Sequence, residues 1–199
     1  MEFADLDLNK VYTYADYFKW KFEERVELIK GYIFKMSPAP NLTHQLISSR
    51  INSELGYYLK GGKCNVFAAP FDVRLPRKSK EDKDISTVVQ PDICVVCNPA
   101  ILDSRGCIGA PDIVVEILSP SNTKKELKYK YEVYEEAGIK EYWVVFPPEE
   151  SIMMYTLVDG KFVASRFKFA GDVFTSEVLQ GFSLDLAQIF AAIPGGPTE

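Results

Sequence analysis

The chain has 199 residues, of which 47% are hydrophobic and 13% aromatic, and its formal net charge is −5. This composition excludes a disordered chain and is sufficient for one large domain, so we expect a single domain over 1–199. The mild negative charge does not indicate a nucleic-acid binder, although a local basic patch can serve that purpose. No apolar run approaches the roughly 18 residues that cross a bilayer, and the N-terminus lacks the pattern of a signal peptide. We therefore expect a cytoplasmic protein with no membrane association.

The N-terminal part is expected to contain a helix over about 13–22, because Thr13 and Asp16 resemble a capping box. The next segment, 25–36, predicts a β-hairpin that turns at Lys30–Gly31. Glu27 is then an acid within an apolar strand. It is either a solvent-facing strand residue or a member of a functional site.

The clearest amphipathic helix follows over 42–59, where apolar residues recur at helical spacing, and Gly61–Gly62 ends it. His44, which is the only histidine, lies in the first turn of this helix. It is either a surface or hydrogen-bonded structural residue, or a proton-transfer or substrate-positioning group near the acids described below.

The middle of the chain alternates between apolar runs and polar loops. Strands are predicted over 65–75, 88–97 and 112–118, with a charged loop over 76–86. The last two of these strands are apolar on both faces, which is typical of central strands covered by helices.

The C-terminal part is predicted to start with a helix. Its N-cap is Ser121, Asn122 or Thr123, and it ends at Gly138. A strand over 139–146 and a β-hairpin formed by 151–158 and 161–169 follow. Asp159–Gly160 is a strong signal for the hairpin turn. Short elements at 173–179 and near 184–190 precede a loose tail.

Four cysteines lie at positions 64, 94, 97 and 107. Cys94 and Cys97 have the spacing of a redox or zinc pair. However, residues three apart in a strand point to opposite faces, so the two sulfurs cannot chelate together. We expect buried free thiols, with zinc or a disulfide as the alternatives.

Acids occupy positions where the central strands otherwise carry Val or Ile. Glu116 is the sharpest case, because apolar residues flank it on both sides. A carboxylate in a buried strand costs several kcal/mol unless a cation or hydrogen bonds compensate for its lost hydration. Several such acids with a lysine on the following helix indicate a metal site, and carboxylate ligands favour Mg²⁺ or Mn²⁺ over zinc. Phosphodiester hydrolysis uses this set of groups.

Several spaced motifs resemble the Uma-two family, which consists of restriction endonuclease-like proteins of the PD-(D/E)XK nuclease superfamily. The motifs are Glu27-Leu28-Ile29 with Gly31, His44, Gln90-Pro91-Asp92, Pro111-Asp112 with Glu116, Ser119-Pro120-Ser121, Lys130 with Tyr134, and 138–143. The resemblance implies an α/β fold with a restriction endonuclease-like core, in which helices flank a mixed central β-sheet. The core would span about 13–158 and 159–199 would form a C-terminal extension, with the β-hairpin as an addition to the core.

The resemblance also implies a divalent-metal-dependent endonuclease acting on DNA. Asp92 and Glu116 would be catalytic metal ligands for Mg²⁺ or Mn²⁺. The usual lysine position after the second acid is occupied here by Leu118, so Lys130 on the next helix is the candidate catalytic lysine. Glu27 would complete the catalytic site.

Three further residues are candidates for substrate binding, namely His44, Gln90 and Lys128. Each main candidate also has a structural alternative. Lys130 could form only a surface pair with Glu126, Asp92 could be a turn residue, and Glu116 could be a buried acid paired with a lysine or arginine. Asp112 either starts its strand or assists the metal, and we expect Tyr134, Tyr142 and Trp143 in the core.

Two alternative functions stay open from the sequence. One is a catalytically inactive nuclease fold used for binding or assembly, and the other is a nuclease acting on RNA or a small nucleotide. A homodimer is also expected, because cutting both strands of a duplex needs two sites.

Overall fold

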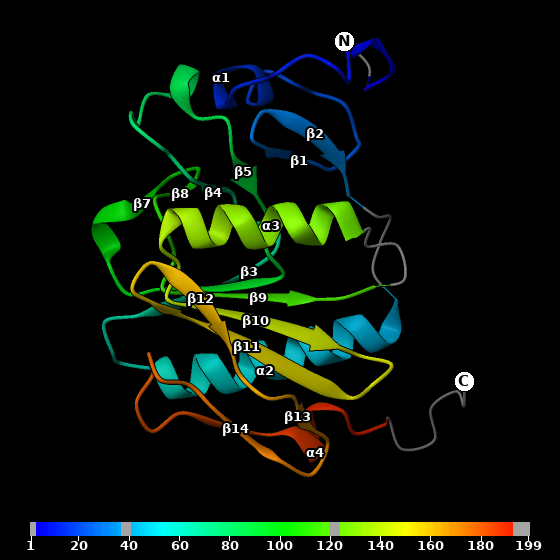
Figure 1. The fold of residues 1–199 in the computed structure, drawn as a ribbon, viewed down its shortest axis with the longest axis vertical. Coiled ribbons are helices and arrows are strands. Elements are labelled where there is room, and N and C mark those ends of the chain that lie inside the picture. Colours follow the sequence, from blue (N-terminus) through cyan, green and yellow to red (C-terminus); the bar gives the residue numbers. More distant parts are fainter. Residues whose placement is uncertain (1–2, 37–40, 120–123, 193–199) are drawn as a thin grey trace.

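The computed structural model describes residues 3–36, 41–119 and 124–192. Two mixed β-sheets dominate this part of the chain, and a long helix lies on each face of the larger sheet (Figure 1). The helices are α1 (Tyr14–Tyr17), α2 (Leu42–Leu59), α3 (Lys124–Ala137) and α4 (Leu186–Ile189), with short 3-10 turns at Phe3–Asp5, Asp82–Asp84 and Pro99–Ile101. The predicted mixed α/β fold class is confirmed.

The larger sheet has seven strands in the order β12-β11-β10-β9-β6-β3, with β13 also paired to β11. They are β3 (Asn65–Ala68), β6 (Ile93–Val96), β9 (Ile113–Ile117), β10 (Glu141–Phe146), β11 (Ser151–Val158), β12 (Lys161–Ala164) and β13 (Lys168–Phe169). Strands β9 and β10 run parallel with α3 between them in the chain. All residues of β6 and β9 are buried, as expected for central strands covered on both faces.

The two long helices bury opposite faces of this sheet. Helix α2 places Ile47, Ile51 and Leu55 against one face, where Val115 also points. Helix α3 packs on the other face, which includes Val114. Each fully buried Ile or Leu contributes about 1.5–3 kcal/mol. Because strand residues alternate between faces, Glu116 points to the same side as Val114, toward α3.

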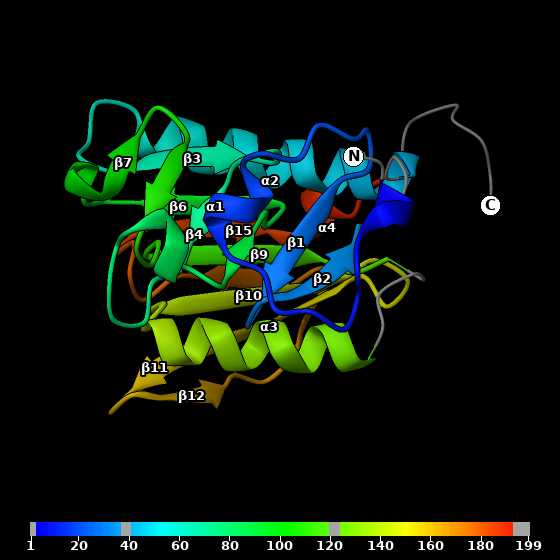
Figure 2. The same cartoon turned by 90° about the horizontal axis from the view of Figure 1, so that it is seen from above.

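The smaller sheet has six strands in the order β2-β1-β5-β4-β8-β7. They are β1 (Val26–Ile29), β2 (Tyr32–Lys35), β4 (Val73–Arg74), β5 (Val88–Val89), β7 (Leu102–Asp103) and β8 (Gly106–Ile108). Helix α3 contacts β1 and lies between the two sheets (Figure 1), and Figure 2 shows it on the opposite side of β9 and β10 from α2. Side chains from both sheets can therefore reach this helix.

Two predicted strands are wrong in extent, because each is divided between the two sheets. Residues 65–75 form β3 and β4, and residues 88–97 form β5 and β6. The breaks contain Pro70 and Pro91, and a proline has no N–H with which to continue a ladder. The segment Gln90-Pro91-Asp92 therefore crosses from one sheet to the other and brings Asp92 to the start of β6.

The predicted helix over 13–22 is also wrong in length, because α1 ends at Tyr17. Thr13 and Asp16 do form the predicted cap, in which the Thr13 N–H donates to the Asp16 carboxylate at 3.0 Å. Beyond the helix, the Trp20 ring packs against Tyr12 and Tyr17. The segment after α1 is therefore packed through its aromatic rings without helical structure.

The other predicted elements lie close to their expected positions, including the hairpin at 25–36, helix 42–59 and a helical turn near the C-terminus. Gly138 follows α3 with a φ of 83°, and the hairpin turn at Asp159–Gly160 has φ of 49° and 76°, as the type I′ turn requires. The predicted cap of α3 at 121–123 and most of the predicted tail lie outside the described residues. Within the described ranges, no helix is long and apolar enough to cross a membrane.

The C-terminal extension is part of the core. Strand β12 of the extension pairs with β11, and the small sheet of β14 (Val173–Thr175) and β15 (Ser183–Asp185) brings Phe174 and Phe182 onto Trp143. The buried Glu141 carboxylate accepts hydrogen bonds from the N–H groups of Glu177 and Val178 and from the Ser176 hydroxyl. Glu141 of the larger sheet therefore holds the extension in place through these hydrogen bonds.

The expectation of free thiols is wrong for Cys64 and Cys97, which form a disulfide. They lie opposite each other just beyond the β3–β6 ladder, in which Asn65 pairs with Val96. Cys94 and Cys97 lie on opposite faces of the sheet, as predicted. Cys94 and Cys107 are free and buried. Only the strand register decides which cysteine faces Cys64, and the sequence did not reveal it.

Candidate functional site

Two carboxylates lie side by side where the central strands β6 and β9 meet. In the antiparallel register Ile93 pairs with Val115, so Asp92 stands opposite Glu116. The Asp92 Oδ2 atom accepts a hydrogen bond from the Ile117 N–H at 2.7 Å. This bond fixes the Asp92 side chain against β9, next to Glu116.

Lys130 of α3 lies over Glu116 from the side of the smaller sheet. Its Nζ atom is 3.0 Å from Glu116 Oε1 and 3.9 Å from Glu126 Oε1. Only 4% of Lys130 is exposed, because it shares the buried face of α3 with Val133 and Tyr134. Lys130 therefore does not form a surface pair with Glu126. Its shorter contacts are to the buried acids Glu116 and Glu27.

Glu27 reaches the same lysine from β1 of the smaller sheet. Its Oε2 atom is 3.0 Å from Lys130 Nζ, and its Oε1 atom accepts a hydrogen bond from the Gln90 N–H at 2.7 Å. Glu27 is only 1% exposed, so it is not a solvent-facing strand residue. The three acids and Lys130 therefore meet at the junction of the two sheets.

Tyr134 is a member of this cluster that the sequence placed only in the core. Its hydroxyl donates to Glu116 Oε1 at 2.6 Å. Burial, together with the charges of Glu116 and Glu27, raises the Tyr134 pKa well above its usual value. A signal for it was present, since Tyr134 lies one helical turn after Lys130 and so faces the same side of α3.

The acids and the lysine control each other's charge. Burial, together with the charges of Asp92 and Glu27, raises the pKa of Glu116 to about 7, although the Lys130 charge and the Tyr134 hydrogen bond act to lower it. Burial by itself would lower the pKa of Lys130, but Glu116, Glu27 and Glu126 outweigh it and raise that pKa well above its ordinary value. Lys130 therefore keeps its positive charge at neutral pH.

His44 of α2 places a ring nitrogen near the acids from the other face of the larger sheet. Asn41 caps α2 by accepting from the His44 N–H at 2.9 Å, and the first turn of the helix lies near the start of β6. His44 Nε2 is then 3.3 Å from Asp92 Oδ2. Burial disfavours the charged ring, but the bond and charge of Asp92 outweigh it and raise the His44 pKa. Within the described residues, the buried Nδ1 atom has no hydrogen-bond partner.

A match over residues 14–187 relates the chain to the Uma2 family model, described as "Putative restriction endonuclease". The chain belongs to the Uma2 family. It is also 26% identical, over 121 residues, to an uncharacterized protein, slr1290, of Synechocystis sp. (strain ATCC 27184 / PCC 6803 / Kazusa). That match covers 60% of each chain, so the alignment spans less than two thirds of that relative's length.

The Uma2 fold is also seen in a crystal structure described as a "putative nuclease belonging to DUF820" from Anabaena variabilis ATCC 29413. The two structures match with a TM-score of 0.70 at 20% sequence identity, over 90% of this chain and 97% of the other. At this identity the match establishes the nuclease-like fold.

The donor set of this Uma2 chain suits a hard divalent ion bound by two protein carboxylates. Among the described residues, no group of three or more His, Cys, Asp and Glu side chains is placed to hold a metal. Mg²⁺ usually takes only one or two carboxylates and completes its shell with water and substrate phosphates. The described residues donate hydrogen bonds to Oδ2 of Asp92 and Oε1 of Glu116, and none of them donates to Oδ1 or Oε2. The residues present therefore fit Mg²⁺ or Mn²⁺.

The side chain of Gln90 does not join the cluster. Its amide nitrogen donates to Asp72 at 2.8 Å and Tyr17 at 3.1 Å, and its oxygen accepts from Arg25 at 2.7 Å. Only its backbone N–H faces the site, through Glu27. Gln90 thus holds the crossing between the sheets in place.

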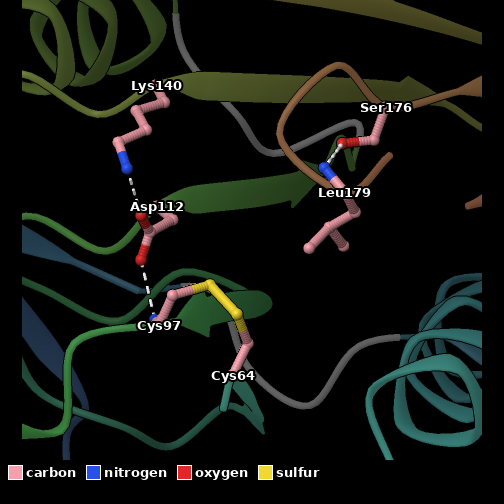
Figure 3. Close-up of a disulfide and its surroundings, with 6 residues drawn as sticks. All are labelled: Cys64, Cys97, Asp112, Lys140, Ser176 and Leu179. Carbon is pink, nitrogen blue, oxygen red and sulfur yellow. Dashed lines mark hydrogen bonds and ion pairs between the residues drawn. A yellow bond between two sulfur atoms is a disulfide. The ribbon is translucent and has the colours of Figure 1, made fainter. Parts of the chain in front are cut away.

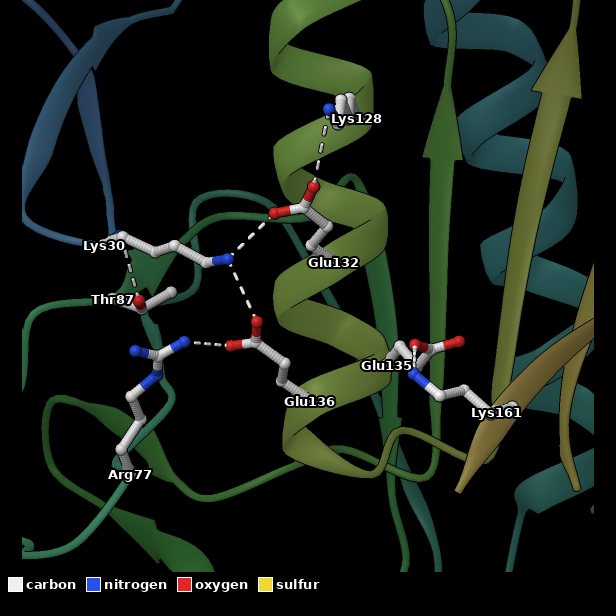
Figure 4. Close-up of polar contacts among 8 residues, drawn as sticks. All are labelled: Lys30, Arg77, Thr87, Lys128, Glu132, Glu135, Glu136 and Lys161. Atoms are coloured by element: carbon white, nitrogen blue, oxygen red, sulfur yellow. Dashed lines mark hydrogen bonds and ion pairs between the residues drawn. The ribbon is translucent and has the colours of Figure 1, made fainter. Parts of the chain in front are cut away.

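Lys128 lies on the outer face of α3, where ion pairs join the helix to the smaller sheet and its loops. It is 4.0 Å from Glu132, and 74% of its side chain is exposed. Figure 4 shows Lys30 between Glu132 and Glu136, at 2.8 and 3.0 Å, and Arg77 paired with Glu136. These pairs hold α3 between the sheets and so position Lys130.

Asp112 lies at the other end of β9 from Glu116. Its carboxylate accepts from the Cys97 N–H at 2.7 Å and from Lys140 Nζ at 2.6 Å. Asp112 therefore lies at the start of its strand, which was one of the two alternatives from the sequence.

Proposed function

We propose that this Uma2 protein is a divalent-metal-dependent nuclease that hydrolyses phosphodiester bonds in DNA. The observation that carries the proposal is the pairing of Asp92 with Glu116 across β6 and β9, with the charged Lys130 held 3.0 Å from Glu116. Two adjacent carboxylates can hold a metal ion that activates water, and a fixed ammonium group can stabilise the charge that develops on a phosphate diester. The family assignment supports the same reaction class.

Asp92 and Glu116 would hold Mg²⁺ or Mn²⁺. When bound, such an ion neutralises phosphate charge and makes a water molecule more acidic. In hydrolysis the water oxygen forms a bond to phosphorus, the bond to the leaving oxygen breaks, and that oxygen takes a proton. Lys130 remains charged throughout and stabilises the negative charge that develops on the phosphoryl oxygens.

Glu27 and Tyr134 support this arrangement without needing to touch the substrate. Glu27 holds the ammonium group of Lys130 from one side, and the Tyr134 hydroxyl holds Glu116 from the other. Rigid placement matters because misplacement of a catalytic group by about 1 Å can cost on the order of 10²-fold in rate. We therefore assign both residues to the positioning of the reacting groups.

Substrate contacts are assigned to His44 and Lys128. His44 is assigned here because its Nε2 atom lies 3.3 Å from Asp92 Oδ2, beside a proposed metal ligand. Lys128 is an exposed cation, of the kind that binds a nucleic-acid backbone. Gln90 contributes through its backbone bond to Glu27, since its amide is already bonded within the protein.

The decisive experiment compares wild type with Asp92→Asn on supercoiled plasmid, single-stranded DNA and RNA, with Mg²⁺ or Mn²⁺. Asp159→Asn at the exposed hairpin tip is the matched control. We expect Asp92→Asn to lose at least about 10²-fold in cleavage rate, with its fold and melting temperature retained, and Asp159→Asn to cut like wild type.

Calorimetric titration of Mn²⁺ into the same three proteins separates the alternatives. Metal binding that Asp92→Asn abolishes, without cleavage of any substrate, would indicate a non-catalytic member of the family. Cleavage of RNA alone would change the substrate class, and the absence of metal binding by wild type would overturn the proposal.

We also propose that two chains act together on duplex DNA, because each chain offers one site and a duplex has two strands. Sedimentation at micromolar concentration should show a homodimer. A strictly monomeric protein that only nicks plasmid would contradict this.

A further inference from the structure

The disulfide between Cys64 and Cys97 is a reactive group that the proposed nuclease site does not use. Cys64 follows α2 and Cys97 follows β6, whereas His44 and Asp92 lie at the opposite ends of these two elements. The bond therefore closes the end of the α2–β6 pair that is away from the acid cluster. Figure 3 shows it beside the ion pair of Asp112 and Lys140.

Cys64, one of the two bonded cysteines, lines a cavity. A pocket of about 520 Å³ lies between the end of α2 and the C-terminal extension, and Lys63, Cys64, Leu179 and Gln180 are among the residues that line it. Cys97 is not one of its lining residues. A small molecule in this pocket would meet Cys64, with the cationic Lys63 beside it.

We propose that Cys64 is a thiol-exchange site for a low-molecular-weight thiol that carries carboxylate groups, such as a glutathione-type peptide. The thiolate of the bound molecule attacks Cys64 Sγ, and a new disulfide forms there. The Cys64–Cys97 bond breaks, and Cys97 leaves as a thiolate that takes a proton from solvent. One disulfide is exchanged for another, so no additional oxidant or reductant is needed.

Size, charge and access favour this occupant. The cavity lies within the range of about 300–1,000 Å³ that small-molecule pockets have. The Lys63 ammonium group attracts both a thiolate and a carboxylate. Cys97 does not line this cavity, and the Asp112 carboxylate beside its N–H is already paired with Lys140. An anionic thiol therefore approaches Cys64 more favourably than Cys97.

The remaining cysteines provide an internal comparison. Cys94 and Cys107 are buried free thiols. Burial raises the pKa of Cys107 to about 12 and that of Cys94 further still. Both stay protonated at neutral pH, and the thiolate is the reactive form. Modification of the folded protein should spare both of them.

The test measures which cysteine captures glutathione in the full chain. Cys97→Ser leaves Cys64 free, and Cys64→Ser leaves Cys97 free. Each variant, checked for folding by circular dichroism, is treated with glutathione disulfide and followed by intact mass and peptide mapping. We expect the adduct on Cys64 to form at least about tenfold faster than that on Cys97. Equal rates, faster capture by Cys97, or no adduct on either would overturn the proposal.

A second comparison tests the pocket itself while both cysteines are retained. Lys63→Glu changes a lining residue, and Lys60→Glu makes the same charge change at an exposed site outside the pocket. Exchange with glutathione should slow several-fold in Lys63→Glu and much less in Lys60→Glu. Exchange with 2-mercaptoethanol, which carries no carboxylate, should slow less in Lys63→Glu than exchange with glutathione does. Equal slowing by the two substitutions would show that the pocket does not direct the thiol.

Discussion

The ammonium nitrogen of Lys130 lies 3.0 Å from Oε2 of Glu27, and this contact joins the smaller sheet to the helix between the sheets. The same nitrogen is 3.0 Å from Glu116 in the larger sheet. Lys130 therefore holds two buried carboxylates from two layers. A buried acid without such a partner carries a large desolvation cost, so the lysine has a structural role as well as the proposed catalytic one.

Lys130→Met should destabilise the protein strongly at neutral pH. The substitution keeps the apolar stem but leaves Glu27 and Glu116 without their cation, and breaking a buried pair costs about 3–5 kcal/mol. Urea unfolding followed by circular dichroism measures the loss.

Lys128→Met is the matched control for this prediction, because it lies two residues away on the same helix with an exposed side chain. We expect its stability to stay within about 0.5 kcal/mol of wild type. Similar losses in the two variants would contradict the ion-pair account.

Tyr134→Phe should test the bond to Glu116 without opening a cavity. The hydroxyl donates to a buried carboxylate at 2.6 Å, and hydrogen bonds to charged groups contribute about 1.5–3 kcal/mol. We expect a loss of that size in the free energy of unfolding, together with a lower rate of DNA cleavage.

Tyr129→Phe on the same helix provides the comparison for Tyr134→Phe. Its ring packs edge-on against Phe34, and this contact survives the loss of the hydroxyl. If the Tyr129 variant were the less stable of the two, the Glu116 bond would not be the reason for the effect of Tyr134→Phe.

Asp72→Asn should stabilise the protein at neutral pH. Burial raises the pKa of Asp72, although its carboxylate accepts bonds from Gln90 and Tyr17. The folded state thus binds this proton more tightly than the unfolded state. The resulting stability is fully present below the unfolded pKa and is lost as pH rises through the folded pKa. An asparagine stays neutral and avoids that loss.

The measurement is urea unfolding of wild type and Asp72→Asn at acidic and at neutral pH. Asp16→Asn serves as a control of opposite sign, because the Thr13 N–H lowers the pKa of Asp16. The stability that the Asp16 carboxylate contributes is present above its unfolded pKa and is lost in acid. The free energy of unfolding of Asp16→Asn should therefore fall below that of wild type mainly at neutral pH. A gain for Asp72→Asn that does not depend on pH would contradict the assignment to burial.

Glu141→Gln should loosen the C-terminal extension. The Glu141 carboxylate is fully buried and accepts four hydrogen bonds, from Trp143, Ser176, Glu177 and Val178. A glutamine places an NH₂ group among these donors, and an unsatisfied buried group costs about 1–3 kcal/mol. Limited proteolysis should cut the extension faster than in wild type. Glu177→Gln, whose side chain is exposed, should not have this effect.

The apolar patterns predicted the elements that carry the fold. Helix 42–59 and the central strand around Glu116 lie where their periodicity placed them, because burial of apolar side chains outweighs the other local preferences. Asp92, Glu116 and Lys130 were selected as site candidates from acids in apolar strands and from the resemblance to a family. The structure brings these three residues together with Glu27, and their catalytic roles remain predictions.

Contacts between layers were decided only by the tertiary structure. Nothing local shows that Pro70 and Pro91 mark crossings between two sheets, that Tyr134 bonds to Glu116, or that Cys97 faces Cys64. Each of these depends on strand register or on helix placement, which are set by the summed packing of residues far apart in the chain. The sequence by itself determined which residues are apolar, acidic or basic along each element. The fold determined which of them meet, because a buried charge persists only where another element supplies its partner.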